Sequence, residues 1–265
     1  MGKPASRRSR QTVLAYALLP YAIVVAVLLV WELLVRVNGV APIYLPAPSS
    51  ILRYLFAMLL DGSLLYNLSV TFLRIIVGFL VAAVTGILVG VGMGMSPLVA
   101  RIVDPWIAAL YPLPKISLIP LLIIWLGTGE SYKIVISAVT AFFPVVISTF
   151  AAIRQVDPGL INAARDLGAN PRQRQAKVVI PASLPGIFAG LHLGMGVTII
   201  MVVAAEMIGG SSDSGMGYLL VHSGQVMETE KVFAALIVLA VFGALITNLQ
   251  KRLDRLIAPW AERVR

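Results

Sequence analysis

The chain has 265 residues, 59% of them hydrophobic and 12% charged, with a mean hydropathy of +0.92. An average soluble domain carries about 25% charged residues, so this composition excludes a soluble fold and predicts a membrane protein. The net charge of +9 would favour a nucleic-acid partner in a soluble protein, but in a membrane protein it reflects basic cytoplasmic loops, and we expect no nucleic acid.

Six apolar runs are long enough to cross a bilayer, which takes about 20 residues. A basic N-terminal stretch, 1–12, precedes the first run, which is too long for the apolar core of a cleavable signal peptide. The third run contains Pro112, Pro114 and Pro120, so we expect it to be broken and buried in protein. The six runs are 13–37, 65–95, 99–127, 132–153, 182–209 and 232–250. They predict an all-α polytopic membrane protein in which residues 1–265 form a single transmembrane domain.

Two longer segments connect the runs on the side opposite the N-terminus. In 38–64, Ser49 or Ser50 is predicted to cap a short amphipathic helix that extends to about Leu60. The segment 210–231 is rich in glycine and serine and is predicted as a loop. Within the runs, glycines recur every four residues, which lets another helix approach closely. These glycines are Gly86, Gly90 and Gly94 in the second run and Gly190 and Gly194 in the fifth.

The basic residues predict the orientation. Most of the 21 lysines and arginines lie before the first run, after the last run or in the loop 154–180, and an even number of spans places these parts on one side. Because basic residues favour the cytoplasmic side, both termini and the loop are predicted to be cytoplasmic.

The segment 154–181 carries the most informative pattern. Asp157 is predicted to cap a helix over 159–167, with Pro158 in its first turn. Gly168 is predicted to end this helix, a second short helix is predicted over 172–179, and Pro181 is predicted to open the next span. The expected result is a compact pair of helices across the cytoplasmic face.

This segment resembles the EAA loop of ABC-importer permeases, which reads Glu-Ala-Ala, three residues, Gly, nine residues, Ile, one residue, Leu-Pro. Asn162 stands in the position of the family's Glu, which removes any salt bridge that the acid would make. The residues in register are Ala163, Ala164, Gly168, Val178, Ile180 and Pro181. Motifs that resemble the nitrate/sulfonate/taurine branch include Leu45-Pro46-Ala47-Pro48-Ser49, Pro112-Leu113-Pro114-Lys115, Trp125-Leu126-Gly127-Thr128-Gly129-Glu130 and Ala204-Ala205-Glu206.

The resemblance implies a type I ABC-importer permease fold in a bacterial inner membrane. It also implies two permease copies around a pathway, two cytoplasmic ATPase subunits that use ATP and Mg²⁺, and an extracytoplasmic binding protein that delivers the solute. The chain itself has no Gly-x-x-x-x-Gly-Lys-Ser/Thr phosphate loop, so the ATPase is expected to be a separate chain and this one no enzyme. The residues expected to meet the ATPase are Asn162, Ala163, Ala164, Gly168 and Pro181.

Polar residues inside membrane spans are costly and are therefore functional candidates. Arg74 and Lys115 are candidates for attracting an anion, although Arg74 has Glu130 as an alternative partner. Glu206 would repel an anion and is expected to pair with Arg74 or Lys115. The remaining pathway candidates are His192 and Thr198, which face different directions on one helix, so that at most one lines a pathway. With no cysteine and two distant histidines, the chain is predicted to hold no metal, catalytic residue or cofactor.

The substrate expected from the resemblance is a small anion such as an alkanesulfonate, taurine or nitrate. The alternatives are a vitamin-like or aromatic solute, such as a thiamine precursor, riboflavin or an aromatic carboxylate. From a different class, an ATP-independent secondary transporter would need ion-coupling carboxylates within the spans, where Glu32 and Glu206 are the main acids. An integral membrane enzyme would need a clustered set of catalytic side chains at one membrane face, which the sequence does not show.

Overall fold

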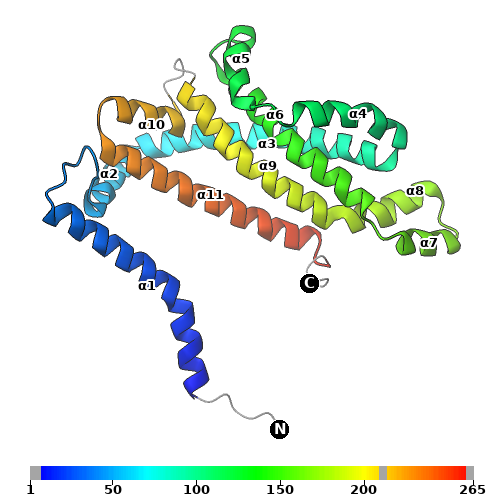
Figure 1. Cartoon of the computed structure of the whole chain (residues 1–265), viewed down its shortest axis with the longest axis horizontal. Helices are drawn as coiled ribbons and strands as arrows, with labels where there is room; N and C mark the ends of the chain where they lie inside the picture. Colours follow the sequence, from blue (N-terminus) through cyan, green and yellow to red (C-terminus); the bar gives the residue numbers. More distant parts are fainter. Residues whose placement is uncertain (1–6, 209–213, 261–265) are drawn as a thin grey trace.

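The computed structural model describes residues 7–208 and 214–260, with side chains from residue 19 onward (Figure 1). Of the basic stretch 1–12, residues 1–6 lie outside the described ranges, as do the terminal arginines 263 and 265. All regular elements in these ranges are helical. They are α1 (Arg7–Val37), α2 (Pro48–Leu60), α3 (Ser63–Met95), α4 (Pro97–Leu110), η1 (Lys115–Leu118), α5 (Ile119–Leu126), α6 (Glu130–Arg154), α7 (Pro158–Asp166), α8 (Pro171–Arg174), η2 (Gln175–Val179), α9 (Ile180–Ile208), α10 (Met216–Gln225) and α11 (Thr229–Ile257).

The predicted spans are confirmed, including the broken one. Within the described residues, five helical segments are long and apolar enough to cross a membrane, and they contain α1, α3, α6, α9 and α11. Helix α4 together with η1 and α5, which bend by 88° at the break between them, makes a sixth when the bent pair is counted as one span. Pro112 and Pro114 lie in this break, and because proline has no N–H to donate, the helix cannot continue through it.

Glycine contacts place α6 between α3 and α9. Along α3, Gly86 and Gly90 lie against Val145 and Thr149 of α6, so the two numbers rise together and the helices are parallel. Along α9, Gly186, Gly190 and Gly194 lie in turn against Ala152, Ser148 and Val145 of α6, so these helices are antiparallel. A Cβ added at Gly90 would lie 2.6 Å from the Cβ of Thr149, which confirms the close helix approach predicted from the four-residue spacing.

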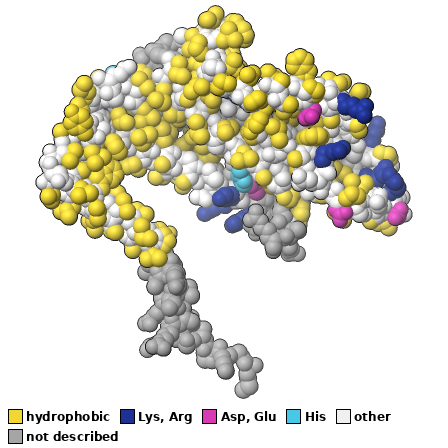
Figure 2. Space-filling view, in the orientation of Figure 1, with side chains coloured by type: hydrophobic (Ala, Val, Ile, Leu, Met, Phe, Trp, Pro, Cys, Tyr) yellow, Lys and Arg dark blue, Asp and Glu magenta, His cyan; other side chains and the backbone are white. Residues whose placement is uncertain are grey.

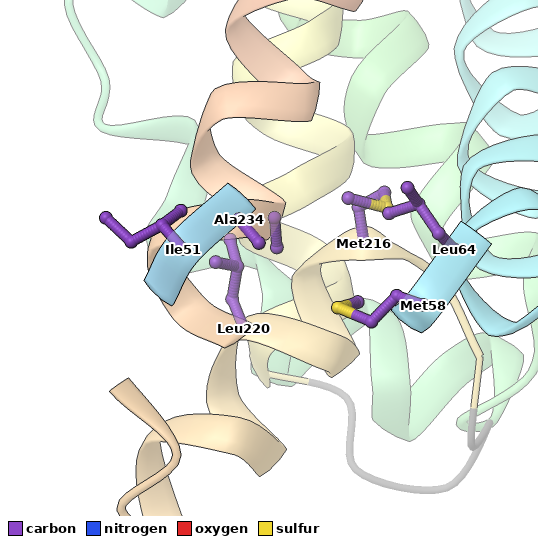
Figure 3. Close-up of a cluster of buried hydrophobic side chains, with 7 residues drawn as sticks. Ile51, Met58, Leu64, Met216, Leu220 and Ala234 are labelled. Carbon is purple, nitrogen blue, oxygen red and sulfur yellow. The ribbon is translucent and has the colours of Figure 1, made fainter. Parts of the chain in front are cut away.

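A second packing centre forms where α2, α10 and the start of α11 meet. Its buried side chains include Ile51, Met58, Leu64, Met216, Leu220 and Ala234 (Figure 3). The prediction of a loop over 210–231 was therefore incomplete, because α10 forms within it and buries Met216 and Leu220 in this cluster. Helix α1 leaves this region and extends away from the other helices (Figure 1).

The start of α2 corrects the predicted cap. The helix begins at Pro48 behind Ala47, which provides no side-chain cap, so neither Ser49 nor Ser50 is the capping residue. Proline suits the first turn of a helix because the N–H groups there have no acceptor within the helix, so the N–H that proline lacks is not needed. The carboxylate of Glu32 instead accepts hydrogen bonds from the N–H and the hydroxyl of Ser49, at 3.0 and 2.7 Å, and pairs with Arg36 one turn further along α1.

Candidate functional site

The segment between α6 and α9 begins as the sequence predicted. The carboxylate of Asp157 accepts a hydrogen bond from the N–H of Gly159 at 2.7 Å, and Pro158 takes the first position of α7. Gly168 follows the helix with a φ of +82°, a conformation that glycine adopts without the strain of a side chain. The N–H of Ala169 then donates to the carbonyl of Ala164 at 2.9 Å and closes the helix end.

The second helix differs from the prediction. Asn170 and Gln173 cap α8 by mutual side-chain to backbone hydrogen bonds of 2.9 and 3.0 Å. From there α8, η2 and α9 form one continuous helical segment, Pro171–Ile208, so Pro181 lies inside a helix rather than opening a span. The π-helical turn η2 allows the helix to continue past this proline. In η2 the N–H of Ile180 donates to the carbonyl of Gln175, five residues earlier. Pro181 comes next, at a position where a regular α-helix would use the N–H that proline lacks.

Helix α7 presents an unusually exposed surface. Ile161 packs on the buried side chains of Ile153, Val156 and Val179, which fixes α7 to the end of the bundle. Asn162 and Ala163 are exposed, and Leu167 next to Gly168 is 89% exposed. The remaining predicted contact residues, Ala164 and Pro181, are half-buried. Helix α7 is thus attached to the bundle along one side and exposes mainly small and polar side chains along the other.

A second polar centre lies at the other end of the bundle, around Arg74 of α3. Its guanidinium binds both carboxylate oxygens of Glu130 at 2.5 Å, with Nε and Nη2 as the donors. Nη1 donates to Glu206 at 2.7 Å and to the carbonyl of Ser214 at 3.0 Å. Arg74 is 2% exposed and Glu206 3%, so this arrangement buries the cation with one of its two acids, whereas the side chain of Glu130 is 53% exposed. The pairings predicted for Arg74 and Glu206 are confirmed, and Arg74, not Lys115, is the partner of Glu206.

The same centre binds the backbone at the start of α10, which the sequence analysis did not predict. The hydroxyl of Thr71 lies 2.9 Å from each oxygen of Glu206 and accepts the N–H of Met216 at 2.8 Å. Glu206 also accepts the N–H of Gly217 at 2.8 Å, and the side-chain oxygen of Asn67 accepts that of Gly215 at 2.7 Å. The Gly-Met-Gly sequence at 215–217 is the signal that could have shown a close backbone approach.

The other pathway candidates lie apart from this centre. The ammonium of Lys115 lies 4.5 Å from the ring centroid of Phe143 and 5.1 Å from that of Tyr111, whose carbonyl it also contacts. Thr198 is fully buried and donates to the carbonyl of Gly194 in its own helix at 2.8 Å.

His192 makes a contact between two helices. Its Nε2 lies 2.8 Å from a carboxylate oxygen of Asp254 in α11. Among the residues that the structure describes, no three histidine, cysteine, aspartate or glutamate side chains are grouped so that they could hold a metal ion.

Comparison with known proteins gives consistent matches. Residues 82–259 match the family described as binding-protein-dependent transport system inner membrane component. A putative aliphatic sulfonates transport permease protein, SsuC, of Bacillus subtilis is 36% identical over 92% of this chain and 86% of its own length. The taurine transport system permease protein TauC of Escherichia coli is 34% identical over 89% of this chain and 87% of its own.

Solved structures support the fold. The inward-facing MetNI methionine ABC transporter matches with a TM-score of 0.61 and 23% identity, over 71% of this chain and 92% of the matched chain. An amino acid ABC transporter crystallised with histidines matches with a TM-score of 0.60 and 19% identity, over 77% and 97% of the two chains. At these identities the similarity is one of fold alone.

Proposed function

Because the chain belongs to the family of binding-protein-dependent transport system inner membrane components, and is thus an ABC-importer permease subunit in the inner membrane, we propose that it transports small organic sulfonates. The observation that carries this substrate class is the pair of relatives named for aliphatic sulfonates and for taurine, which align with 92% and 89% of this chain. Taurine is itself an aliphatic sulfonate, so the two names describe one chemical class.

The cation that we assign to this anion is Lys115. Arg74 is neutralised by Glu130 and Glu206, whereas Lys115 stands at the break between α4 and α5 beside two aromatic rings. Broken helices are tolerated at membrane depth where they line a cavity, and the free ends of such helices commonly contact the solute. An ammonium on an aromatic surface at such a break can attract a sulfonate and release it again.

We assign the contact with the ATPase to α7 and its flanks. Asn162, Ala163, Ala164 and Gly168 give this helix a slim outer surface, and the exposed Leu167 adds an apolar contact. Pro181 lies in the continuous helical segment that follows α7 and includes α9, so this segment connects the proposed contact to the membrane span. Two ATPase subunits that close on ATP and Mg²⁺ would move two such segments and switch the pathway between its two states.

The complete importer in this proposal contains two copies of the chain, two ATPase subunits and an extracytoplasmic binding protein. The C-terminal ends of α3, α6 and α11 and the whole of α7 face the cytoplasm, as the basic residues predict. The binding protein delivers the sulfonate to the opposite face. ATP binds to the ATPase subunits and not to this chain.

The test is ATP-driven uptake in vesicles that contain the chain with the ATPase encoded beside it and the cognate binding protein. We expect uptake of labelled taurine that needs ATP, Mg²⁺ and binding protein, and that excess alkanesulfonate inhibits. An ATPase variant without hydrolytic activity is the matched control. If riboflavin, a thiamine precursor or an aromatic carboxylate inhibits uptake and alkanesulfonate does not, the substrate belongs to that class and not to the sulfonates. Uptake without ATP would overturn the proposal in favour of a secondary transporter.

A further inference from the structure

Helix α10 is attached to the bundle by the backbone of its first residues. The N–H groups of Gly215, Met216 and Gly217 donate to Asn67, Thr71 and Glu206, respectively, at 2.7 to 2.8 Å. The carbonyl of Ser214 accepts from Arg74. Three N–H groups at a helix start normally lack partners within the helix, so side chains of α3 and α9 here satisfy them.

The attachment leaves no space for an alternative geometry. Thr71 is fully buried and Asn67 is 8% exposed. Gly215 has a φ of +110°, and a Cβ there would lie 2.5 Å from the carboxylate carbon of Glu206. A Cβ at Gly217 would lie 2.7 Å from the Cβ of Glu206. A buried polar network whose members are satisfied in this way holds its parts in one arrangement.

One helix joins this attachment to the segment that we assign to the ATPase. The continuous segment Pro171–Ile208 starts beside α7 and carries Glu206 near its far end. Glu206 holds the start of α10, and Met216 and Leu220 of α10 belong to one buried cluster with Ile51 and Met58 of α2 (Figure 3). A displacement at one end of this segment therefore reaches both α10 and α2.

We propose that Asn67, Thr71 and Arg74 of α3 and Glu206 of α9 form a latch that keeps α10 fixed to both helices, so that α10 and the buried cluster that it shares with α2 follow them when the ATPase changes state. These residues are positioning residues. The part of this inference that concerns the ATPase rests on the proposed function, whereas the fixed geometry of α10 does not. Arg74 also connects α6 to the latch through Glu130.

The variants must weaken the latch without leaving a buried charge unpaired. Removing Arg74 or Glu206 would leave its buried partner charge unpaired, and an unpaired buried charge disrupts folding. Thr71→Val keeps the shape of the side chain but removes both its hydrogen bond to Glu206 and the acceptor for Met216. Thr71→Ser restores both and is the matched control. Asn67→Leu, which removes the acceptor for Gly215, is the second variant if Thr71→Val does not fold.

The first measurement is a distance between spin labels on α10 and α9. The chain has no cysteine, so Gln225→Cys in α10 and Leu193→Cys in α9, both exposed, provide the label sites. We expect one narrow distance distribution in the wild type and in Thr71→Ser, unchanged when a non-hydrolysable ATP analogue is bound to the complex. Thr71→Val and Asn67→Leu should broaden it. A distribution that stays narrow in both variants, or a wild-type distance that changes with nucleotide, would overturn the latch.

The second measurement is ATPase activity of the complex in lipid nanodiscs, with and without loaded binding protein. We expect Thr71→Val to keep the basal rate but to lose stimulation by about fivefold or more, because the variant removes two buried hydrogen bonds and the loss of one already corresponds to about fivefold. Thr71→Ser should restore stimulation, which a general loss of stability would not do. Full stimulation in Thr71→Val would refute the transmission by α9. If no ATPase assembles with the wild type, the proposed function fails, while the label distances in the permease alone still decide the latch.

Discussion

Gly90 and Gly196 both lie in membrane-spanning helices, but their surroundings differ. A Cβ at Gly90 would lie 2.6 Å from the Cβ of Thr149 and 2.8 Å from the carbonyl oxygen of Val146, whereas at Gly196 nothing lies within 4 Å. We expect Gly90→Ala to separate α3 from α6 and to destabilise the chain by about 1–3 kcal/mol, the usual effect of overpacking. The melting temperature in detergent should fall accordingly, while Gly196→Ala should leave it nearly unchanged.

Gly196→Ala is the control for the effect of alanine itself. Alanine favours a helix more than glycine does, so Gly→Ala at a position with open space should not destabilise the helix. An equal loss of stability in both variants would show that glycine is needed for another reason than the contact with α6. The close packing would then lose its physical explanation.

At the residue scale, the sequence predicted partners better than it predicted positions. Arg74 and Glu206 are charges in apolar surroundings, and a buried charge requires an opposite one, so their pairing followed from the sequence. Their contacts with the backbone of 214–217 did not, because any residue offers an N–H and a carbonyl. Only the fold shows which backbone groups come near.

At the scale of the element, the end of α7 depends on one backbone conformation. Gly168 has a φ of +82°, and a Cβ there would meet nothing within 4 Å in this chain. Valine at this position therefore acts through backbone strain, about 1–2 kcal/mol in the left-handed region, and not through a clash. We expect Gly168→Val to shift the end of α7 and to abolish most ATP-driven uptake while membrane insertion stays normal.

Asparagine provides the matched control for Gly168. It tolerates the left-handed conformation at helix ends better than other residues with a side chain. Gly168→Asn should therefore keep most of the uptake in the same vesicle assay. If Gly168→Asn and Gly168→Val lose uptake equally, the requirement at this position is a close approach of the partner and not the conformation of the chain.

Other elements show where sequence patterns were sufficient and where they failed. The long apolar helices α3, α6 and α11 were predictable because a bilayer requires about 20 apolar residues in each span. Helix α10 was missed because Gly217 and Gly224 lower its helix propensity, and burial of Met216 and Leu220 in the cluster shared with α2 and α11 compensates for this loss. The continuity of α8 with α9 was missed because a proline at 181 normally marks a helix start.

At the scale of the whole molecule, the packing gathers the basic residues at one end. Helices α3 and α6 are parallel and α9 is antiparallel to them, so 96–101 and 154–180 lie at the same end. Ile246 of α11 packs with Met195 and Val202, and Asp254 reaches His192, so α11 also runs toward this end. On the face drawn in Figure 2, the dark blue side chains lie near α4, over α7 and α8, and near the end of α11, whereas the rest of this face is yellow and white.

This distribution predicts the orientation in the membrane, which labelling can test. Two variants, Arg101→Cys and Gln225→Cys, each carry a single thiol because the chain has no cysteine of its own. Both positions are exposed and lie at opposite ends of the bundle. With a membrane-impermeant maleimide on spheroplasts, we expect Gln225→Cys to react at once and Arg101→Cys to react only after the membrane is opened. Basic segments resist translocation, which is the physical reason for this difference. The opposite pattern would place α7 outside the cell, where no ATP-driven subunit could reach it, and would refute the coupling role of α7 together with the orientation.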